Sequence, residues 1–228
     1  MLYVGLVCGF YVMYAVAPSL GIERTAASVA ALIMFLPAVA GARIWFVLDH
    51  WEIYRHDPRR IWRYSEGGMA LYGGLLLALV LSVPVLAALG LGFAAFWDGA
   101  TFTMLTGMIF TRVGCLLNGC CAGRPHDGRL GWRLPDHKGR WVRRYPVQLL
   151  EMAAAAALLA ASVVLLWVGV PRGTIFLAAL FGYAATRFAI DPLRERSAGV
   201  TVDHRRALAV FVTCAVALSA LGWFVTTA

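Results

Sequence analysis

Seven apolar stretches of roughly 20 residues dominate this sequence, and they restrict its fold more than any other feature. A helix of about 20 apolar residues crosses the roughly 30 Å hydrocarbon core of a bilayer. Strands of a membrane barrel would instead alternate apolar and polar residues, which these stretches do not. The chain is also 61% hydrophobic, against about 45–50% in soluble domains. We therefore predict an all-α polytopic membrane protein, one integral domain over residues 1–228 with about seven transmembrane helices. The expected spans are Leu2–Leu20, Ala26–Leu48, Met69–Leu91, Phe93–Leu117, Val147–Val170, Thr174–Ile190 and Ala207–Thr226.

The positive charge of the chain is concentrated in three of its loops. Its nineteen arginines and single lysine outnumber twelve acidic residues, which gives a net charge of +8. The arginines gather in residues 50–63, 124–144 and 194–206, which are the second, fourth and sixth loops between spans. With seven spans these loops share one membrane face, and the positive-inside rule places that face in the cytoplasm. Nucleic acid is excluded as a partner, because the basic loops are separated by membrane spans and match no binding fold.

The first apolar stretch and the fourth loop each lead to one further expectation. The first apolar stretch has no basic segment before it and no clear cleavage site, so it is predicted to be a span and not a cleaved signal. Residues 124–145 are predicted to form a short basic loop outside the membrane.

Charged residues inside or beside the spans point to a binding site, because burying a charge in a membrane is costly. Arg43 lies within the second apolar stretch and Arg112 near the end of the fourth. Arg187, Asp191 and Arg194 follow at helical spacing, so they share one face, although Pro192 should end or kink that helix. Ion pairs and side chains reaching the interface are the structural alternative. A common anionic ligand at headgroup depth is the functional one, since guanidinium groups bind phosphate through paired hydrogen bonds.

Two further segments place polar or very small residues at helix starts. In "EGGMALYGGLL", Gly73 and Gly74 follow Tyr72, and such glycines allow close approach of another helix or of a ligand. In "RRYPVQLLE" a proline suits the first turn of a helix. Gln148 and Glu151 are then three residues apart on one face, and we expect that face to point into the bundle.

Three cysteines in "TRVGCLLNGCCAGRP" allow several interpretations. Cys115 lies three residues after Arg112, and a neighbouring arginine favours the nucleophilic thiolate. Cys120 and Cys121 fall at the expected helix end. The three could bind a metal ion with His126, form a redox pair, pack as small residues, or line a lipid site. Cys8 and Cys214 lie mid-span, where cysteine behaves as a small apolar residue.

Taken together, four motifs resemble the prolipoprotein diacylglyceryl transferases, in the order found in that family. They are "GARIWFVLDHW" with "EGGMALYGGLL", then "TRVGCLLNGCCAGR", "RRYPVQLLE" and "GYAATRFAIDPLR". The resemblance runs from about Tyr3 to Arg196. Arg112 and Asn118 match residues of the family signature, Arg187 the late arginine, and Asp191 an acidic position.

The resemblance implies a multi-pass enzyme of the bacterial cytoplasmic membrane. Members of that family move the diacylglyceryl group of phosphatidylglycerol to the cysteine thiol of a prolipoprotein and release glycerol phosphate. No cofactor and no metal are implied. We expect Arg112, Arg187, Tyr72, Cys115 and Cys120 to be the catalytic residues. Substrate binding is assigned to Arg43, Gly73, Gly74, Asn118, Gly119, Cys121, Arg143, Arg144, Gln148, Glu151, Asp191 and Arg194.

The sequence departs from the family pattern at three positions. Tyr72 stands where the family has histidine, Cys115 where it has asparagine, and Cys120 where it has glutamate. A tyrosine, with an ordinary pKa of about 10, is a poor base for a thiol. Other functions therefore stay open: another small thiol or hydroxyl compound as acceptor, a thiol–disulfide oxidoreductase or metal-binding protein using the three cysteines, or a lipid-binding homologue without activity.

The resemblance also disagrees with the charge distribution about orientation. The family places its catalytic face outside the cytoplasm, whereas the arginine-rich loops favour the inside. A reporter fused after Ala228 distinguishes the two, because a cytoplasmic C-terminus fits the family arrangement.

Overall fold

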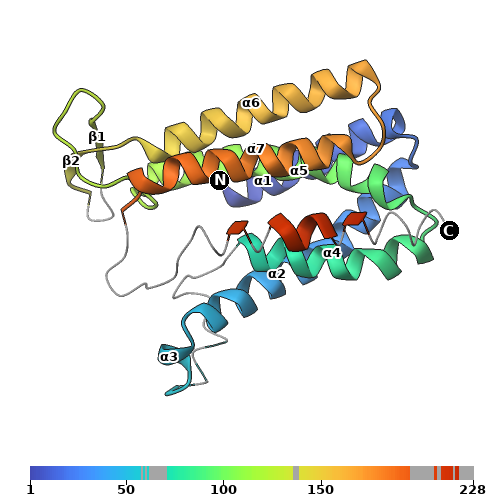
Figure 1. The fold of residues 1–228 in the computed structure, drawn as a ribbon, viewed down its shortest axis with the longest axis horizontal. Helices are drawn as coiled ribbons and strands as arrows, with labels where there is room; N and C mark the ends of the chain where they lie inside the picture. Colours follow the sequence, from blue (N-terminus) through green and yellow to red (C-terminus); the bar gives the residue numbers. More distant parts are fainter. Residues whose placement is uncertain are drawn as a thin grey trace. The chain divides into compact units, whose positions relative to one another are not determined.

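Six of the predicted spans are present as helices in the computed structural model of the protein (Figure 1). It describes residues 1–57, 59, 61, 71–135, 139–195, 208–209, 212–217 and 219–220. All six helices are long and apolar enough to cross a membrane, which confirms a multi-pass helical membrane protein. They are α1 (Leu2–Val16) continued by the 3₁₀ turn η1 (Ala17–Leu20), α2 (Arg24–Asp49), α4 (Leu71–Ala88), α5 (Phe93–Leu117), α6 (Val147–Val168) and α7 (Thr174–Ile190).

The remaining elements are short. The predicted seventh span, Ala207–Thr226, lies only partly within the described residues, where 212–217 are helical. Helix α3 (Trp51–Tyr54) follows α2, and the 3₁₀ turn η4 (Asp191–Leu193) follows α7, as expected from Pro192. The predicted loop 124–145 contains an antiparallel hairpin of β1 (Trp132–Pro135) and β2 (Trp141–Arg144), which the sequence analysis did not predict.

The chain divides into two compact units. The first comprises Met1–Arg24 and Ala95–Thr201, and so holds α1, nearly all of α5, the hairpin, α6 and α7. The second comprises Thr25–Ala94 and Val202–Ala228, with α2, α3 and α4. That the whole chain acts as one membrane domain stays a prediction.

Glycines bring α1 and α5 into close contact in the first unit. A Cβ atom on Gly5 would lie 2.9 Å from the Cβ of Phe110, and one on Gly9 would lie 3.0 Å from the side chain of Thr103. The hydroxyl of Thr103 donates a hydrogen bond of 3.0 Å to the carbonyl of Gly9. Small residues four apart let helices pack tightly in lipid, where there is no hydrophobic drive to associate. Residue numbers increase along α1 while those of the contacting residues decrease along α5, so the two helices are antiparallel.

At the start of α7, a buried carboxylate replaces the usual N-terminal cap. Asp98 of α5 accepts hydrogen bonds from the backbone N–H groups of Gly173 (2.7 Å) and Phe176 (2.9 Å). The first N–H groups of a helix have no partner within the helix, and a carboxylate there also suits the helix dipole. Asp98 thus fixes the beginning of α7 against the beginning of α5. Helices α6 and α7 then run side by side (Figure 1).

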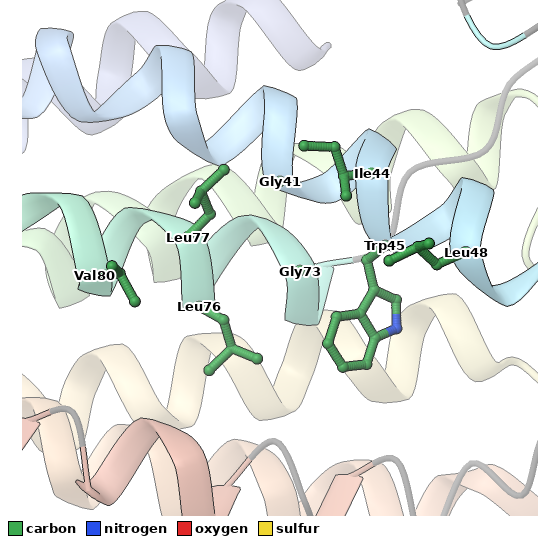
Figure 2. A pocket seen from close by; sticks show the side chains of 8 residues that line it. All are labelled: Gly41, Ile44, Trp45, Leu48, Gly73, Leu76, Leu77 and Val80. Carbon is green, nitrogen blue, oxygen red and sulfur yellow. The ribbon is translucent and has the colours of Figure 1, made fainter.

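Glycines also join α2 and α4 in the second unit. A Cβ on Gly74 would lie 2.6 Å from the carbonyl oxygen of Ala38, and one on Gly73 would overlap Trp45 and the carbonyl of Gly41. Both glycines are therefore required by helix packing. Beside this crossing is an apolar pocket of about 260 Å³, shown in Figure 2. It is lined by Gly41, Ile44, Trp45, Leu48, Gly73, Leu76, Leu77 and Val80.

Candidate active site

Three arginines converge on one buried carboxylate in the first unit. Glu151 of α6 contacts the Nε atom of Arg112 at 2.8 Å through Oε2. Its Oε1 atom accepts hydrogen bonds from Nη1 of Arg187 (3.0 Å) and Nη1 of Arg194 (2.8 Å). We call these four residues the arginine cluster. All four are site residues expected from the sequence, whereas the contact of Glu151 with the three arginines was not predicted.

The helices bring the cluster to one end of the unit. Arg112 lies five residues before the end of α5, Glu151 four residues after the start of α6, and Arg187 three residues before the end of α7. At a rise of about 1.5 Å per residue, each lies within roughly 8 Å of a helix end. This is the depth at which a spanning helix passes from hydrocarbon to headgroups.

The cluster carries more positive than negative charge. Three guanidinium groups and one carboxylate give these four residues a net charge of +2. The side chain of Glu151 is 3% exposed, whereas those of Arg112, Arg187 and Arg194 are 15%, 16% and 21% exposed. The carboxylate is therefore sealed inside, while the arginines are open enough to meet a ligand. An anion is the ligand that this arrangement favours.

A turn at the end of α5 places the cysteines beside this cluster. Gly119 has a left-handed backbone (φ +64°) and is buried. The N–H of Gly119 donates to the carbonyl of Leu116, and the N–H of Cys120 donates to that of Cys115. This pattern is the Schellman ending of a helix, which favours glycine at the left-handed position. It folds the chain back, so that Cys120 lies next to Cys115.

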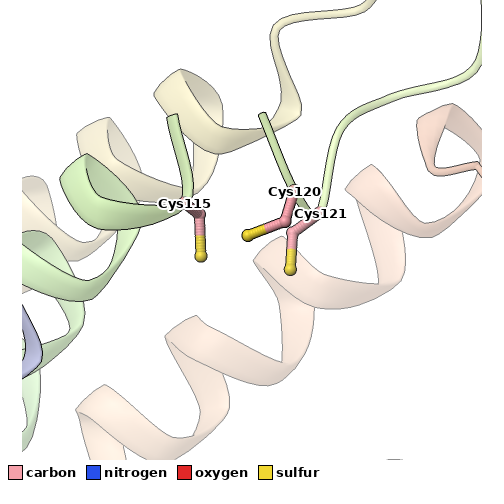
Figure 3. Close-up of side chains that lie close together, drawn as sticks. All are labelled: Cys115, Cys120 and Cys121. Atoms are coloured by element: carbon pink, nitrogen blue, oxygen red, sulfur yellow. The ribbon is translucent and has the colours of Figure 1, made fainter. Parts of the chain in front are cut away.

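The three thiols form a compact group (Figure 3). The sulfur atoms of Cys115, Cys120 and Cys121 all lie within 4.8 Å of one another. Cys121 has a φ of +56°, an uncommon value for a residue with a side chain. A hydrogen bond from the Cys115 thiol, aided by the charges of Arg112 and Arg194, lowers the pKa of Cys121 to about 5. Desolvation and the charge of Cys121 raise the pKa of Cys120.

The segment after the cysteines is hydrogen-bonded on both sides. The backbone N–H of Gly123 donates to the carbonyl of Tyr145, and the N–H of Tyr145 donates to the carbonyl of Arg124. The N–H of Arg124 in turn donates to the carbonyl of Leu193 at 2.9 Å. A Cβ on Gly123 would lie 2.5 Å from the carbonyl oxygen of Tyr145, so only glycine fits between the two neighbouring strands of chain. This pairing fixes the segments that carry Arg144 and Arg194.

Several other expected site residues lie around the cluster. The amide of Gln148, 1% exposed, donates to the carbonyl of Cys120 at 2.9 Å. The prediction that Gln148 and Glu151 point into the bundle is therefore confirmed. Arg144 is buried and pairs with Glu195 at 3.2 Å. Asp191 is buried just beyond α7, and Asn118 is exposed at the end of α5.

Arg143 lies outside this group. It donates to the carbonyls of Gly128 and Gly131 and so supports the loop before the hairpin. Its predicted contact with substrate stays a prediction.

The remaining candidates belong to the second unit. The buried Arg43 donates to the carbonyl of Ile61 at 3.0 Å and lies over the rings of Phe46 and Tyr54. Tyr72 is half-buried at the start of α4. That Arg43, Tyr72 and the two neighbouring glycines share a site with the arginine cluster stays a prediction.

Two acidic residues that hold this unit together, Asp98 and Glu195, were not predicted from the sequence. Asp98 lies within an apolar stretch, where a charged residue is costly. The same reasoning that identified Arg43 therefore applies to Asp98. Glu195, the partner of Arg144, gave no signal, because an acidic residue in a charged loop is ordinary.

Comparisons with known proteins agree on a single family. The family model described as prolipoprotein diacylglyceryl transferase matches residues 1–226. A phosphatidylglycerol–prolipoprotein diacylglyceryl transferase of Tropheryma whipplei (strain Twist) is 28% identical over 206 residues, covering 83% of this chain and 74% of that protein. Proteins of the same description from Idiomarina loihiensis and Bacillus cereus are 30% and 28% identical over 167 and 202 residues. These matches cover 72% and 85% of this chain, and 62% and 74% of the two relatives.

Proposed function

Because the chain belongs to the prolipoprotein diacylglyceryl transferase family, we propose that it transfers the diacylglyceryl group of phosphatidylglycerol to the cysteine thiol of a prolipoprotein. We place it in the bacterial cytoplasmic membrane, since its relatives are bacterial and its helices are of spanning length. In this reaction a C–S bond forms at the glyceryl carbon while the bond from that carbon to the phosphate oxygen breaks. Glycerol phosphate leaves, and the thiol proton passes to a base.

The observation that carries the proposal is the net charge of +2 on the arginine cluster. The phosphodiester of phosphatidylglycerol has one negative charge, and the departing phosphate monoester approaches two. Positive groups already fixed in place stabilise such developing charge, and electrostatic stabilisation of this kind is usually the largest single contribution to catalysis. The position of the cluster near the ends of α5, α6 and α7 suits a lipid phosphate at headgroup depth.

Roles for the individual residues follow from this charge argument. Arg112 and Arg187 contact the phosphate, helped by Arg194, while Glu151 holds the three guanidinium groups together against their mutual repulsion. Gln148 orients the turn that carries the cysteines through its bond to the Cys120 carbonyl. The roles of Arg43, Tyr72, Gly73 and Gly74 rest on the resemblance of their motifs to the family.

Purified protein tests the proposal directly. The wild type and the variants Arg112→Ala and Arg187→Ala are mixed with phosphatidylglycerol and a prolipoprotein signal peptide containing its cysteine. Mass spectrometry follows the added diacylglyceryl group, and an enzymatic assay follows the released glycerol phosphate. Transfer should fall by about 100-fold or more in each variant, as when a charge-stabilising donor is removed.

Arg55→Ala is the matched control, because Arg55 is exposed and its side chain contacts its near neighbours in sequence Glu52 and His56. It should keep the wild-type rate. Full activity of both cluster variants would refute the site, and absence of transfer by the wild type with any prolipoprotein peptide would refute the function.

A further inference from the structure

The three thiols have the spacing of ligands around one metal ion. A zinc ion binds thiolates at about 2.3 Å, so two sulfurs on the same ion are roughly 4 Å apart. The sulfurs of Cys115, Cys120 and Cys121 lie within 4.8 Å of one another. They come from the last turn of α5 and from the residues after it, and the backbone holds both parts through the left-handed conformations of Gly119 and Cys121. Small side-chain rotations are therefore enough to bring all three sulfurs to binding distance of one ion.

The surrounding charges suit a metal–thiolate group. Three thiolates and one divalent ion sum to −1, and the neighbouring arginine cluster carries +2. The C-terminal end of a helix carries a partial negative charge from its free carbonyls, which favours a cation. That end of α5 is where the three cysteines gather. Soft thiolate ligands favour zinc or copper(I) over magnesium and calcium.

The group also has room for one more ligand. Within the part of the chain that the structure describes, it consists of the three cysteines alone. His126, which the spacing offered as a fourth ligand, stacks on Tyr145 with 4.3 Å between ring centroids. Cys120 and Cys121 are exposed, so a molecule from outside can reach the ion. Structural zinc sites have four protein ligands, whereas catalytic ones have three and an open position.

We propose that Cys115, Cys120 and Cys121 bind a zinc ion whose open position takes the thiol of the acceptor. The catalytic half of this inference rests on the proposed lipid transfer, while metal binding does not. A thiol that coordinates zinc loses its proton, here to solvent. Its sulfur then attacks the glyceryl carbon of the lipid, the electron pair of the broken C–O bond passes to the phosphate oxygen, and the thioether product leaves the ion. No oxidant or reductant is needed.

This site explains how the chain could activate a thiol with Tyr72 in the position of the family's histidine. Coordination lowers the thiol pKa without any general base. The phosphate is held by the arginine cluster next to the thiols, so both reactants are brought together near the end of α5.

Metal binding is tested on the full-length protein in detergent. The reduced protein is equilibrated with buffered Zn²⁺, and elemental mass spectrometry counts the bound ions; about one per chain is expected. Co²⁺ in place of Zn²⁺ should give the intense sulfur-to-cobalt absorption of a thiolate site. Both signals should disappear in Cys121→Ser and in the triple serine variant of the three cysteines. They should persist in the control Cys8→Ser/Cys214→Ser, whose residues lie elsewhere in the chain.

Transfer assays separate this inference from the proposed function. Zinc-dependent transfer that falls at least tenfold in Cys121→Ser supports the inference, as does zinc binding that survives Arg187→Ala while transfer is lost. Wild-type protein that transfers lipid but binds neither Zn²⁺ nor Co²⁺ overturns the inference and leaves the proposed function standing. Zinc bound without any effect on transfer overturns the catalytic half.

Discussion

The two ends of the first unit each bury a carboxylate, and the two carboxylates are satisfied in opposite ways. Asp98, 1% exposed, accepts hydrogen bonds from two backbone N–H groups at the start of α7. Glu151, 3% exposed, is shared by three arginines near the end of α7. The first arrangement uses fixed, neutral backbone donors, which add no positive charge that could bind an anion. In the second, three guanidinium groups share one carboxylate, so we interpret the Asp98 end as a structural joint and the Glu151 end as suited to bind an anion.

The largest expected effect comes from Glu151→Gln. A neutral amide cannot hold three guanidinium groups together, and losing one member of a buried ionic group costs about 3–5 kcal/mol. We expect transfer to fall by about 100-fold or more, because the phosphate-binding charges move apart. Activity per folded molecule and thermal unfolding in detergent measure both effects. A variant with the wild-type rate would show that the cluster has no part in transfer.

At the other end, Asp98→Asn should affect stability and leave the chemistry nearly unchanged. The amide oxygen of asparagine can keep one bond from the start of α7, but its NH₂ group then faces the second backbone N–H. A buried donor left without a partner costs about 1–3 kcal/mol. Thermal unfolding should show this loss, while the transfer rate of the folded fraction stays within about twofold. A loss of transfer without loss of stability would contradict the assignment of Asp98 as structural.

Two helix-ending glycines sharpen the comparison further. Gly119 ends α5 beside the cysteines, and Gly169 ends α6 with φ +75° and open space around its Cα. Alanine in a left-handed conformation costs roughly 1–2 kcal/mol at either position. Only Gly119→Ala should also weaken Zn²⁺ binding and slow transfer, because it disturbs the turn that gathers the thiols. Equal losses of transfer in both variants would mean that stability alone explains the effect.

The smallest effect is expected for Arg172→Ala. Arg172 is exposed and donates one bond of 3.3 Å to the carbonyl of Ser19. Surface substitutions of this kind change stability by about 0.5 kcal/mol or less. Unfolding and transfer should both match the wild type. A large loss of transfer here would show that binding extends to the Asp98 end.

Much of the fold could be predicted because bilayer thickness sets helix length. The expected bounds of Phe93–Leu117 and Thr174–Ile190 agree with α5 and α7 to the residue. The end of α5 at a glycine and the end of α7 before Pro192 also followed from local backbone chemistry. The hairpin could not be predicted, since each of its strands is only four residues long and no periodicity can be read from so few.

The site itself could be predicted only as a set of residues. Charged groups beside the spans identified Arg112, Arg187 and Arg194, and helical spacing identified Glu151 as inward-facing. Their meeting depends on which helices are neighbours, and spacing within one helix does not contain that information. For the same reason, the proximity of the three sulfurs became visible only with the turn at Gly119.

The pairing of Glu151 also has a consequence for how the protein is made. Its three partners come from α5, from α7 and from the segment after α7, so they emerge from the ribosome at different times. When α6 enters the membrane, only Arg112 has been synthesised, and the carboxylate has one counterion of the three it finally holds. A nascent chain that ends before α7 therefore holds a neutral Arg112–Glu151 pair, and the excess of positive charge arises only when Arg187 and Arg194 follow. The positive charge that we propose to bind the lipid phosphate is thus complete only after α7 and the segment that follows it have been synthesised.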